Sequence, residues 1–337
     1  MTASLSGSER PLAEAHDLAL VDLDGVAYQG RLPIAHAADS LAEARQRGLR
    51  LLFVTNNASR EPEEVASRLT GLDIPTEPDE VMTAAQACAN LLRTRLEPGA
   101  KVLVVGGKGL VTAVAEAGYQ VVSSADDGPD AVAQGFSPEL AWPDLAEAAY
   151  AVAGGAWHVA SNRDLSLPTE RGFAPGNGAL VAAVVAATGI QPDSAGKPEP
   201  TMYRMAVERH GARRPLVIGD RLDTDLAGAR AGGYPGLHVL TGVSSARDAV
   251  LAEPGMRPDY LGADLRALLE PHPAPSEADD GWWRCGERSA RVVDGALELD
   301  GQGQSGIDVV RAACAAAWSA VDGGAALEPD GVPELTA

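Results

Sequence analysis

Cysteine is scarce in this chain. Its 337 residues include three cysteines, Cys88, Cys285 and Cys314, which lie far apart in the sequence. No two of them have the Cys-x-x-Cys spacing of a zinc or redox site, and an odd number does not suggest a disulfide framework. We therefore expect each cysteine to be an ordinary buried side chain in a protein of a reducing compartment.

Basic residues are outnumbered by acidic ones. The 27 lysines and arginines stand against 47 aspartates and glutamates, which gives a net charge of −20. Nucleic acids and anionic membranes attract positive surfaces, so this balance argues against both as partners. A small anionic substrate is not excluded, because a bound cation and a few buried basic groups can hold a phosphate locally.

Long apolar runs are also missing. No stretch reaches the roughly 18 apolar residues of a membrane span, and the first 17 residues, MTASLSGSERPLAEAHD, lack the apolar core of a signal peptide. A cytoplasmic location is therefore expected. Hydrophobic residues make up 45% of the chain and charged residues 22%, as in globular proteins. The length predicts two or three domains.

Strand and helix patterns alternate along most of the chain. Strands are expected at 17–24, 49–57, 101–107, 214–221 and 235–242. Helices are expected at 35–48, 61–72, 109–118, 178–189, 199–211 and 224–233, and the pattern continues through 81–96, 130–136, 142–152 and 156–162. Such alternation predicts an α/β protein with a parallel sheet.

The sequence changes character after residue 269. Residues 271–281 are rich in proline, alanine and acids, which is typical of a linker. Beyond them, 282–300 predicts a pair of short strands and 306–321 a helix. Trp282 and Trp283 are adjacent in a chain with only 4% aromatic residues. We expect them to pack on the main body or on a second subunit rather than to be exposed.

The run VDLDGV at 21–26 contains two acids two residues apart, Asp22 and Asp24. If the strand continues through them, its period of two points both carboxylates to one face. Like charges so close repel unless a cation lies between them. One acid could then attack a phosphorus atom while the other moves protons. A turn or a helix cap after the strand is the alternative interpretation.

Two other segments carry groups that bind phosphate. Thr55, Asn56 and Asn57 end a predicted strand, where a hydroxyl and loop N–H groups can hold phosphate oxygens. An Asx turn is the alternative there. Lys197 stands in Gly-Lys-Pro, where Pro198 favours an extended backbone and the ammonium group can neutralise a phosphate. Taken alone, it could equally be a surface lysine.

A fourth segment, GDRLDTDLAG at 219–228, adds more acids. Asp220 follows a predicted strand, as Asp22 does, and Asp225 lies at the start of the next helix. Asp225 could also serve as a helix cap or a first-turn acid. Together the four segments offer a nucleophile, metal ligands, hydrogen-bond donors and a positive charge, which phosphate chemistry at strand ends requires.

In this order, DLDGVAYQG, FVTNNASR, GKPEP and GDRLDTDLAGARAGG resemble the motifs of the haloacid dehalogenase-like (HAD) phosphatases. The chain is similar to the branch that contains p-nitrophenyl, phosphoglycolate and glycerol-3-phosphate phosphatases. That branch inserts a large C2-type cap domain between the second and third motifs. ASNRDLSLPTERGFAPGNGALVAA resembles the end of this cap. The resemblance covers roughly residues 15–265.

The resemblance implies a domain plan. A doubly wound, Rossmann-like parallel-sheet core is expected at 1–80 plus 190–268, an inserted α/β cap at 81–189, a linker at 269–281 and a small C-terminal β–α element at 282–337. The last element could be a fragment of an acetyltransferase-like fold. Residues 301–306, GQGQSG, do not make a convincing acyl-CoA loop, so a structural or dimerising role is preferred.

The resemblance also implies roles at the catalytic centre. Asp22 would be the nucleophile that forms an aspartyl-phosphate. Asp24 would be the acid for the leaving alcohol and then the base for water, which requires a raised pKa at the first step. Magnesium would be held by the Asp22 side chain, the backbone carbonyl of Asp24 and Asp220.

Further roles follow for the other motifs. Thr55, Asn56, Asn57 and Lys197 would bind the phosphoryl group, and Asp225 would support the metal site or Lys197. In the cap, the residues that could read the substrate are His158, Asn162, Arg163, Asp164 and Asn177. The alternative for these residues is an ordinary solvated loop position.

The expected activity is Mg²⁺-dependent hydrolysis of a small phosphorylated metabolite. The resemblance favours glycerol 3-phosphate, then 2-phosphoglycolate, then a nucleoside monophosphate. A sugar-phosphate phosphotransferase or mutase and a catalytically silent binding module are the alternatives, and the intact Asp22 and Lys197 argue against the latter. The expected partner is this phosphate ester, with no nucleic acid and no membrane, and a homodimer could form through the cap or the C-terminal element.

Overall fold

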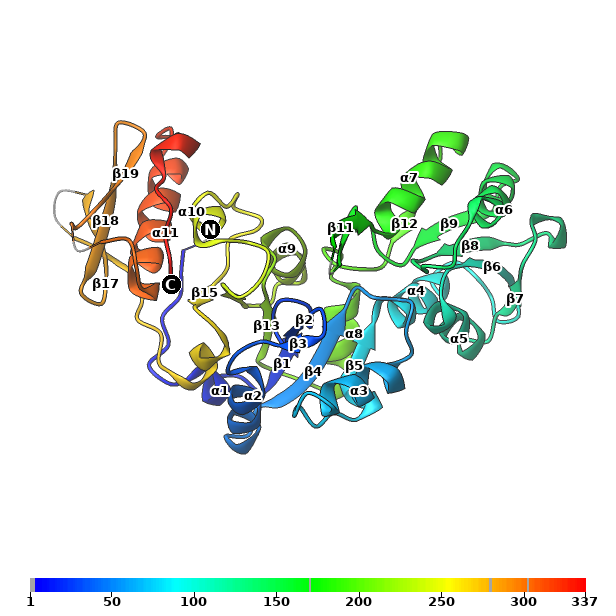
Figure 1. Cartoon of the computed structure of the whole chain (residues 1–337), viewed down its shortest axis with the longest axis horizontal. Helices are drawn as coiled ribbons and strands as arrows, with labels where there is room; N and C mark the ends of the chain where they lie inside the picture. Colours follow the sequence, from blue (N-terminus) through cyan, green and yellow to red (C-terminus); the bar gives the residue numbers. More distant parts are fainter. Residues whose placement is uncertain (1–3, 170, 279–280, 302) are drawn as a thin grey trace. The chain divides into compact units, whose positions relative to one another are not determined.

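The computed structural model describes residues 4–337 except 170, 279–280 and 302. Contacts within the chain divide it into two compact units, one of residues 1–52 with 207–337 and the other of residues 53–206. The elements of both units are labelled in Figure 1. This division does not test the domain boundaries proposed above, which stay a prediction.

The first unit contains a parallel sheet of strands that are apolar almost throughout. They are β1 (Leu18–Val21), β13 (Pro215–Gly219), β14 (Gly236–Val239) and β15 (Tyr260–Gly262), in the order β15-β14-β13-β1. β4 (Arg50–Thr55) follows β1 in the sheet and leads into the second unit. Every residue of β1 and β13 is buried, as expected for parallel strands that are covered on both faces.

Short helices and turns connect these strands. They are α1 (Leu12–Ala15), α2 (Ala37–Gln46), η3 (Leu222–Leu226), α9 (Ala227–Gly232), α10 (Ala246–Val250) and η4 (Leu265–Leu269), with a small hairpin of β2 (Tyr28–Gln29) and β3 (Leu32–Pro33). α2 buries Ala37, Leu41 and Ala44, which lie on one face of a helix with 3.6 residues per turn. The predicted α/β fold with a parallel sheet is confirmed.

The second unit begins with the end of β4. Residues Phe53–Thr55 pair in parallel with β5 (Val81–Thr83). The other elements of this part are α3 (Pro62–Thr70), η1 (Pro78–Glu80) and α4 (Ala84–Leu92). Thr83 begins α4 with a capping box, since its hydroxyl accepts from Gln86 N and the Gln86 side chain accepts from Thr83 N.

A second parallel sheet follows within this unit, with strand order β12-β9-β8-β6-β7. Its strands are β6 (Lys101–Val105), β7 (Gln120–Val122), β8 (Ala131–Gln134), β9 (Trp157–Ala160) and β12 (Asp193–Ser194). The accompanying elements are α5 (Lys108–Glu116), η2 (Ala125–Asp127), α6 (Trp142–Ala153), the hairpin of β10 (Ser166–Thr169) and β11 (Gly172–Pro175), α7 (Asn177–Thr188) and α8 (Thr201–His210). α8 ends in the first unit.

The C-terminal element is an antiparallel sheet with one long helix (the orange strands and the red helix in Figure 1). The strands β16 (Ser276–Glu277), β17 (Trp283–Cys285), β18 (Arg288–Val293) and β19 (Ala296–Leu299) precede α11 (Ile307–Asp322) and η6 (Pro329–Gly331). The sequence predicted two strands within 282–300 and the helix, whereas three strands, β17, β18 and β19, lie in that range and β16 precedes them. β16 was missed because it pairs its backbone with β17 inside a stretch whose composition is typical of a linker.

This element shares a hydrophobic core with the rest of the first unit. One cluster of buried side chains contains Leu222, Leu226 and Ala249 together with Cys314 and Trp318 of α11. Trp318 Nε1 also donates a hydrogen bond to the carbonyl of Ala249 over 3.1 Å. The C-terminal element is therefore packed into the unit that carries the acidic motifs.

The two adjacent tryptophans pack inside the first unit. Trp283 lies against the shared cluster, as predicted. The guanidinium group of Arg291 lies over the ring of Trp282, with Cζ 4.7 Å from the ring centre. Neither side chain is fully exposed.

The cysteines are ordinary buried side chains, as the sequence predicted. All three cysteines are free and buried, and burial raises the pKa of Cys88 to about 12. Among the helices of the described residues, none is long and apolar enough to cross a membrane.

Candidate active site

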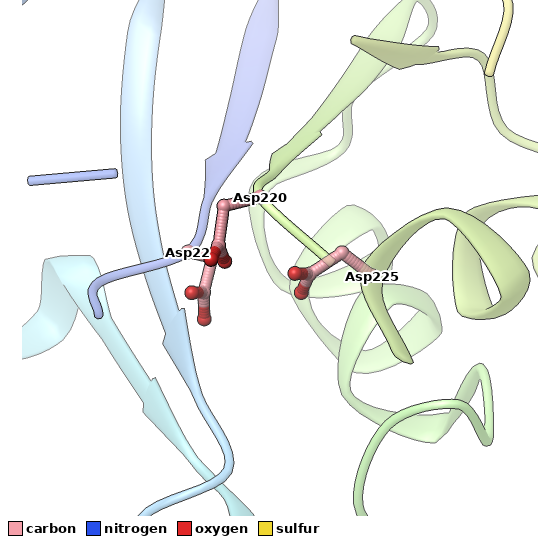
Figure 2. A group of neighbouring side chains, drawn as sticks. All are labelled: Asp22, Asp220 and Asp225. Atoms are coloured by element: carbon pink, nitrogen blue, oxygen red, sulfur yellow. The ribbon is translucent and has the colours of Figure 1, made fainter. Parts of the chain in front are cut away.

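Three carboxylates meet at one edge of the sheet in the first unit. β1 and β13 are parallel neighbours with Leu18 opposite Pro215, so Asp22 and Asp220 follow their strands at the same end. Asp22, Asp220 and Asp225 each offer an oxygen, and these three atoms lie within 4.8 Å of one another. Figure 2 shows the three side chains directed toward one common point.

A wide helical turn brings Asp225 to this point. The N–H groups of Asp225 and Leu226 both donate to the carbonyl of Arg221, over 3.0 and 3.2 Å, and η3 is a π-helical turn. The Asp225 carboxylate in return accepts from Arg221 N over 3.2 Å. The sequence predicted a regular helix from residue 224, and such π turns are frequent at functional sites.

The cluster is suited to a divalent cation. Asp22 is 9% exposed, and Asp220 and Asp225 are each 1% exposed. Buried carboxylates this close repel one another strongly unless a positive charge lies among them. An all-oxygen set of ligands is what Mg²⁺ and Ca²⁺ prefer. The residues present therefore fit the magnesium ion that the sequence predicted.

Two glycines make room for the Asp220 carboxylate. Gly25 has a φ of +85°, and a Cβ at Gly25 or at Gly242 would overlap the carboxylate of Asp220. Any other residue would have to displace it. The glycine in the Asp-Leu-Asp-Gly run is thus explained by the close approach of the Asp220 carboxylate.

The loop after β14, which carries none of the predicted site residues, supports the cluster. Thr241 Oγ1 donates to the carbonyl of Gly25 over 2.5 Å, and Val243 N donates to Asp220 Oδ2 over 2.7 Å. Ser244 Oγ accepts from Leu222 N over 3.1 Å. The loop joins the segment after β1 to the segment after β13. Its only sequence signal is a run of small and polar residues, TGVSS, directly after β14.

The charges beside the cluster are already compensated. His238 is buried under the β13 end, with Nδ1 3.2 Å from the carbonyl of Gly219, and burial lowers its pKa to about 4, so its ring is neutral at pH 7. Burial would raise the pKa of Asp223, but the hydrogen bonds and charge of Arg221, together with nearby backbone N–H groups, hold the pKa below its ordinary value. Asp223 therefore pairs with Arg221, at 2.8 Å.

Asp24 contributes no carboxylate to the cluster. β1 ends at Val21, so the strand period does not set the directions of Asp22 and Asp24, contrary to the sequence argument. A tight loop begins instead, because the carbonyl of Leu23 accepts from the N–H groups of Ala27 and Tyr28. The Asp24 side chain is exposed. Binding of magnesium by the backbone carbonyl of Asp24 stays a prediction.

In the second unit, Thr55 and Asn57 form turns at the end of β4. Thr55 Oγ1 accepts from Asn57 N over 3.1 Å. Asn57 Oδ1 accepts from both N and Oγ of Ser59 over 2.8 Å. The Asx turn considered as the alternative is thus present. Phosphate binding by these two side chains stays a prediction.

Lys197 is not a surface lysine. Its side chain is buried, at 4% exposure, and Nζ lies 3.3 Å from the carbonyl of Val54, beside the end of β4. Asn56 fixes its backbone, since Asn56 Oδ1 accepts from Lys197 N over 2.8 Å and Asn56 Nδ2 donates to Lys197 O over 3.2 Å. Asn56 therefore holds Lys197 in place at the end of β4.

Three of the cap candidates are buried and hydrogen-bonded within the second unit. His158 Nε2 lies 2.9 Å from Gln134 Oε1. Asn177 Nδ2 donates to the carbonyl of Asn162 over 2.7 Å, and Asn162 Nδ2 donates to the carbonyl of Asn56 over 2.8 Å. These bonds give the three residues structural tasks, and contact with a substrate stays a prediction.

The other two cap candidates lie in the loop after β9. The Asp164 carboxylate accepts from Asn56 Nδ2 over 3.1 Å. Arg163 is exposed, and its Nη2 lies 3.8 Å from Glu199 Oε1. Of the five cap candidates, Arg163 is the one whose charge faces solvent. A role in reading the substrate stays a prediction for both.

Comparison with known families gives three matches. A family model described as haloacid dehalogenase-like hydrolase matches residues 19–120. A second, described as HAD-hydrolase-like, matches residues 194–268. A third, described as a GCN5-related N-acetyltransferase like domain, matches residues 285–335. The first two include the segments that hold Asp22, Lys197, Asp220 and Asp225.

Several individual proteins are similar over most of the chain. The D-glycerol 3-phosphate phosphatase of Mycobacterium tuberculosis (strain ATCC 25618 / H37Rv) is 46% identical over 319 residues, which cover 92% of this chain and 88% of that protein. A crystal structure of a glycerol phosphate phosphatase from M. tuberculosis, in complex with magnesium, has a TM-score of 0.85 at 47% identity and covers 92% of each chain. The acid sugar phosphatase of Staphylococcus aureus (strain MRSA252) is 38% identical over 252 residues, 74% of this chain and 95% of that protein.

Proposed function

The chain belongs to the haloacid dehalogenase-like hydrolases, and we propose that it hydrolyses glycerol 3-phosphate with the help of Mg²⁺. The sequence predictions of the family, of the α/β fold and of an enzyme that hydrolyses phosphoric monoesters are confirmed. The observation that carries the proposal is the buried group of three carboxylates. Asp22 follows β1, Asp220 follows β13 and Asp225 lies in η3. The group occurs in a chain 46% identical to a D-glycerol 3-phosphate phosphatase.

We infer the following chemistry for the two acids of the first motif. An oxygen of the Asp22 carboxylate attacks the phosphorus atom, and the bond from phosphorus to the leaving alcohol breaks. Asp24, as the carboxylic acid, gives its proton to that alcohol. Asp24, now a carboxylate, takes a proton from water, whose oxygen attacks the phosphorus of the aspartyl-phosphate. Inorganic phosphate leaves, and both aspartates return to their first state.

The metal would be held by the carboxylates of Asp22, Asp220 and Asp225, with the backbone carbonyl of Asp24 as a further oxygen ligand. The short distances within the cluster favour Asp225 as a direct ligand, whereas its sequence position suggested a supporting role. A bound Mg²⁺ would neutralise charge that develops on the phosphoryl oxygens. The loop at Thr241 keeps these ligands in position before the substrate arrives.

Thr55, Asn56, Asn57 and Lys197 are proposed to bind the phosphoryl group. The burial of Lys197 supports this role, because a buried ammonium group is costly unless it meets negative charge. Asn56 supports it by fixing the backbone of Lys197 from both sides. Thr55 would bind by donating its hydroxyl hydrogen, because Oγ1 uses only a lone pair to accept from Asn57 N. Asn57 would bind by donating from its side-chain amide.

A substrate panel tests the proposal. Phosphate release is measured with malachite green on glycerol 3-phosphate, 2-phosphoglycolate and nucleoside monophosphates, with Mg²⁺. We expect the highest kcat/KM for glycerol 3-phosphate. Asp22→Asn, assayed in parallel, should release almost no phosphate from any of them. A clear preference for another compound would reject the substrate but leave the phosphatase mechanism intact.

Partners, location and the C-terminal element complete the proposal. We propose a cytoplasmic enzyme without nucleic-acid or membrane partners, in keeping with its net charge of −20 and its free cysteines. A homodimer through the cap or the C-terminal element stays open to measurement by light scattering. The C-terminal element is proposed to stabilise the first unit through their shared core. Deletion of residues 275–337 that left both stability and oligomer size unchanged would refute this role.

A further inference from the structure

A cavity lies at the opposite end of the strands that carry the acidic cluster. It measures about 400 Å³ and opens between the segments that precede β1, β13 and β14. His16 stands two residues before β1, Arg213 and Arg214 directly before β13, and Tyr234 shortly before β14. Asp22 and Asp220 follow the same two strands at their other ends, about 15 Å away for strands of this length.

Two arginines lend this cavity a positive charge. Arg213 and Arg214 are both exposed and both line it. Among the residues that the structure describes, no carboxylate forms an ion pair with either guanidinium group and no acceptor bonds to it. Two adjacent arginines whose guanidinium groups make neither an ion pair nor a hydrogen bond with the described residues are unusual in a chain whose net charge is −20. Such groups bind phosphates and carboxylates with paired N–H donors.

Asp17 fixes the loop that carries the arginines without occupying their side chains. Its two carboxylate oxygens accept from the backbone N–H groups of Arg213 and Arg214, each over 2.9 Å. Burial would raise the pKa of Asp17, but these bonds and the nearby Arg50 and Arg214 hold the pKa below its ordinary value. Asp17 is thus ionised, and its hydrogen bonds fix the backbone from which the side chains of Arg213 and Arg214 extend.

The other charges at this edge leave a positive balance. Arg50 donates to the carbonyls of Asp17 and His210, over 3.1 and 2.8 Å, so its charge stays beside the cavity. Burial lowers the pKa of His16, whose ring is neutral at pH 7. Three arginines therefore face two aspartates here, Asp17 and Asp259, whose carboxylate accepts from Gly236 N over 2.9 Å.

The rest of the lining is apolar. It consists of Ala15, Val207, Ala212, Pro215, Gly233 and Pro235, beside the ring of Tyr234. The volume lies within the roughly 300–1,000 Å³ typical of small-molecule sites. We propose that this cavity binds an organic phosphate, with the phosphate group on Arg213 and Arg214 and the apolar body against Tyr234 and the two prolines. This site is separate from the catalytic centre and does not depend on the proposed function.

Calorimetry with adenosine 5′-monophosphate (AMP) on the full chain in EDTA tests the site. Without divalent cations, AMP is not hydrolysed and the acidic cluster repels it. We expect saturable binding of one AMP per chain. Arg213→Gln with Arg214→Gln should weaken it at least tenfold. Both side chains are exposed and their backbone bonds to Asp17 remain, so the variant should fold and keep its phosphatase activity.

A second double variant controls for charge alone. Arg93→Gln with Arg284→Gln removes the same two charges from exposed positions elsewhere, and AMP affinity should stay within twofold. Inorganic phosphate should bind more weakly than AMP, because it lacks a body for the apolar wall. The proposal is overturned by an absence of saturable binding, by equal losses in the two double variants, or by phosphate binding as tightly as AMP.

Discussion

At the scale of single residues, the notable feature is a group of three like charges. Asp22, Asp220 and Asp225 present oxygens within 4.8 Å of one another in a nearly buried position. Their mutual repulsion destabilises the metal-free protein. A cation removes that repulsion and so stabilises the folded state by its own binding. Metal affinity and stability are thus linked at this site.

Asp220→Asn should therefore have opposite effects in EDTA and in Mg²⁺. In EDTA the variant should melt about 2 °C or more above wild type, because one of the three repelling charges is gone. In excess Mg²⁺ the order should reverse, and Mg²⁺ affinity measured by calorimetry should fall at least tenfold.

Asp223→Asn is the matched control for this variant. Asp223 lies in the same segment but is paired with Arg221, and its side chain is 57% exposed. The Mg²⁺ affinity of Asp223→Asn should stay within about twofold of wild type. Equal losses of affinity in the two variants would mean that the cluster does not bind the metal.

Thr241 should influence the metal without touching it. Thr241→Val keeps the shape of the side chain but removes the hydrogen bond to the carbonyl of Gly25. One such bond contributes about 1 kcal/mol, so Mg²⁺ should bind roughly fivefold more weakly by calorimetry. Thr241→Ser keeps the donor and should restore most of the affinity. Identical behaviour of the two variants would show that the hydroxyl is not needed.

The sequence identified some of these residues and missed others for a physical reason. Asp22, Asp220 and Lys197 occur in motifs whose chemistry can be recognised from residue types alone. Thr241 and Val243 act through a backbone carbonyl and a backbone N–H. Any residue except proline supplies a backbone N–H, and many threonines follow strands, so nothing in the chain marks Thr241 and Val243 before the fold is known.

At the scale of elements, hydrophobic periodicity predicted where strands and helices lie but not how they end. β1 ends at Val21, and the segment that follows is a loop held by the carbonyl of Leu23. Asp225 lies in a π turn and not in a regular helix. Both deviations occur at or beside the residues proposed to hold the metal. They depend on contacts with distant loops, which a local pattern cannot contain.

His272 joins two elements and should make stability depend on pH. Its Nε2 lies 2.8 Å from the carbonyl of Ala267 in η4, and its Nδ1 lies 3.2 Å from Arg311 of α11. Burial, together with Arg311, lowers its pKa to about 4, and the bond to Ala267 only partly offsets this. The unfolded chain takes up the proton near pH 6.5. The contribution of neutral His272 to the free energy of unfolding is therefore fully present above pH 6.5 and is lost as the pH falls toward 4.

Urea unfolding at pH 6.5 and pH 5 measures this effect. Wild type should lose roughly 2 kcal/mol more between the two pH values than His272→Gln, which cannot take up the proton. The comparison cancels the contributions of other groups, including His238. An equal loss in both proteins would contradict the assignment.

At the scale of the whole molecule, the C-terminal element is part of the unit that carries Asp22, Asp220 and Asp225. Its helix α11 shares one hydrophobic cluster with Leu222 and Leu226, the residues at the two ends of the turn that carries Asp225. Composition predicted a linker and a separate small element. It could not show that the element completes an existing core, because burial between distant segments leaves no local signal.

The ion pair between Arg257 and Asp322 tests this connection. The Arg257 side chain is 1% exposed and its Nη1 lies 2.8 Å from Asp322 Oδ2 in α11. Asp322→Ala leaves a buried charge without its partner and should lower the free energy of unfolding by about 3 kcal/mol. Arg257→Met combined with Asp322→Ala should recover part of that loss. A loss below 0.5 kcal/mol in the single variant, about the size of a surface effect, would mean that the element is loosely attached.

The central claim is that Asp22 becomes phosphorylated during turnover. The most direct measurement is acid quenching of the enzyme during hydrolysis of glycerol 3-phosphate with Mg²⁺, followed by borohydride reduction and mass spectrometry of the peptide that contains residue 22. We predict that Asp22 is reduced at its side chain in the quenched enzyme and not in enzyme without substrate. Rapid hydrolysis with Asp22 unmodified, or undiminished hydrolysis by Asp22→Asn, would contradict the account.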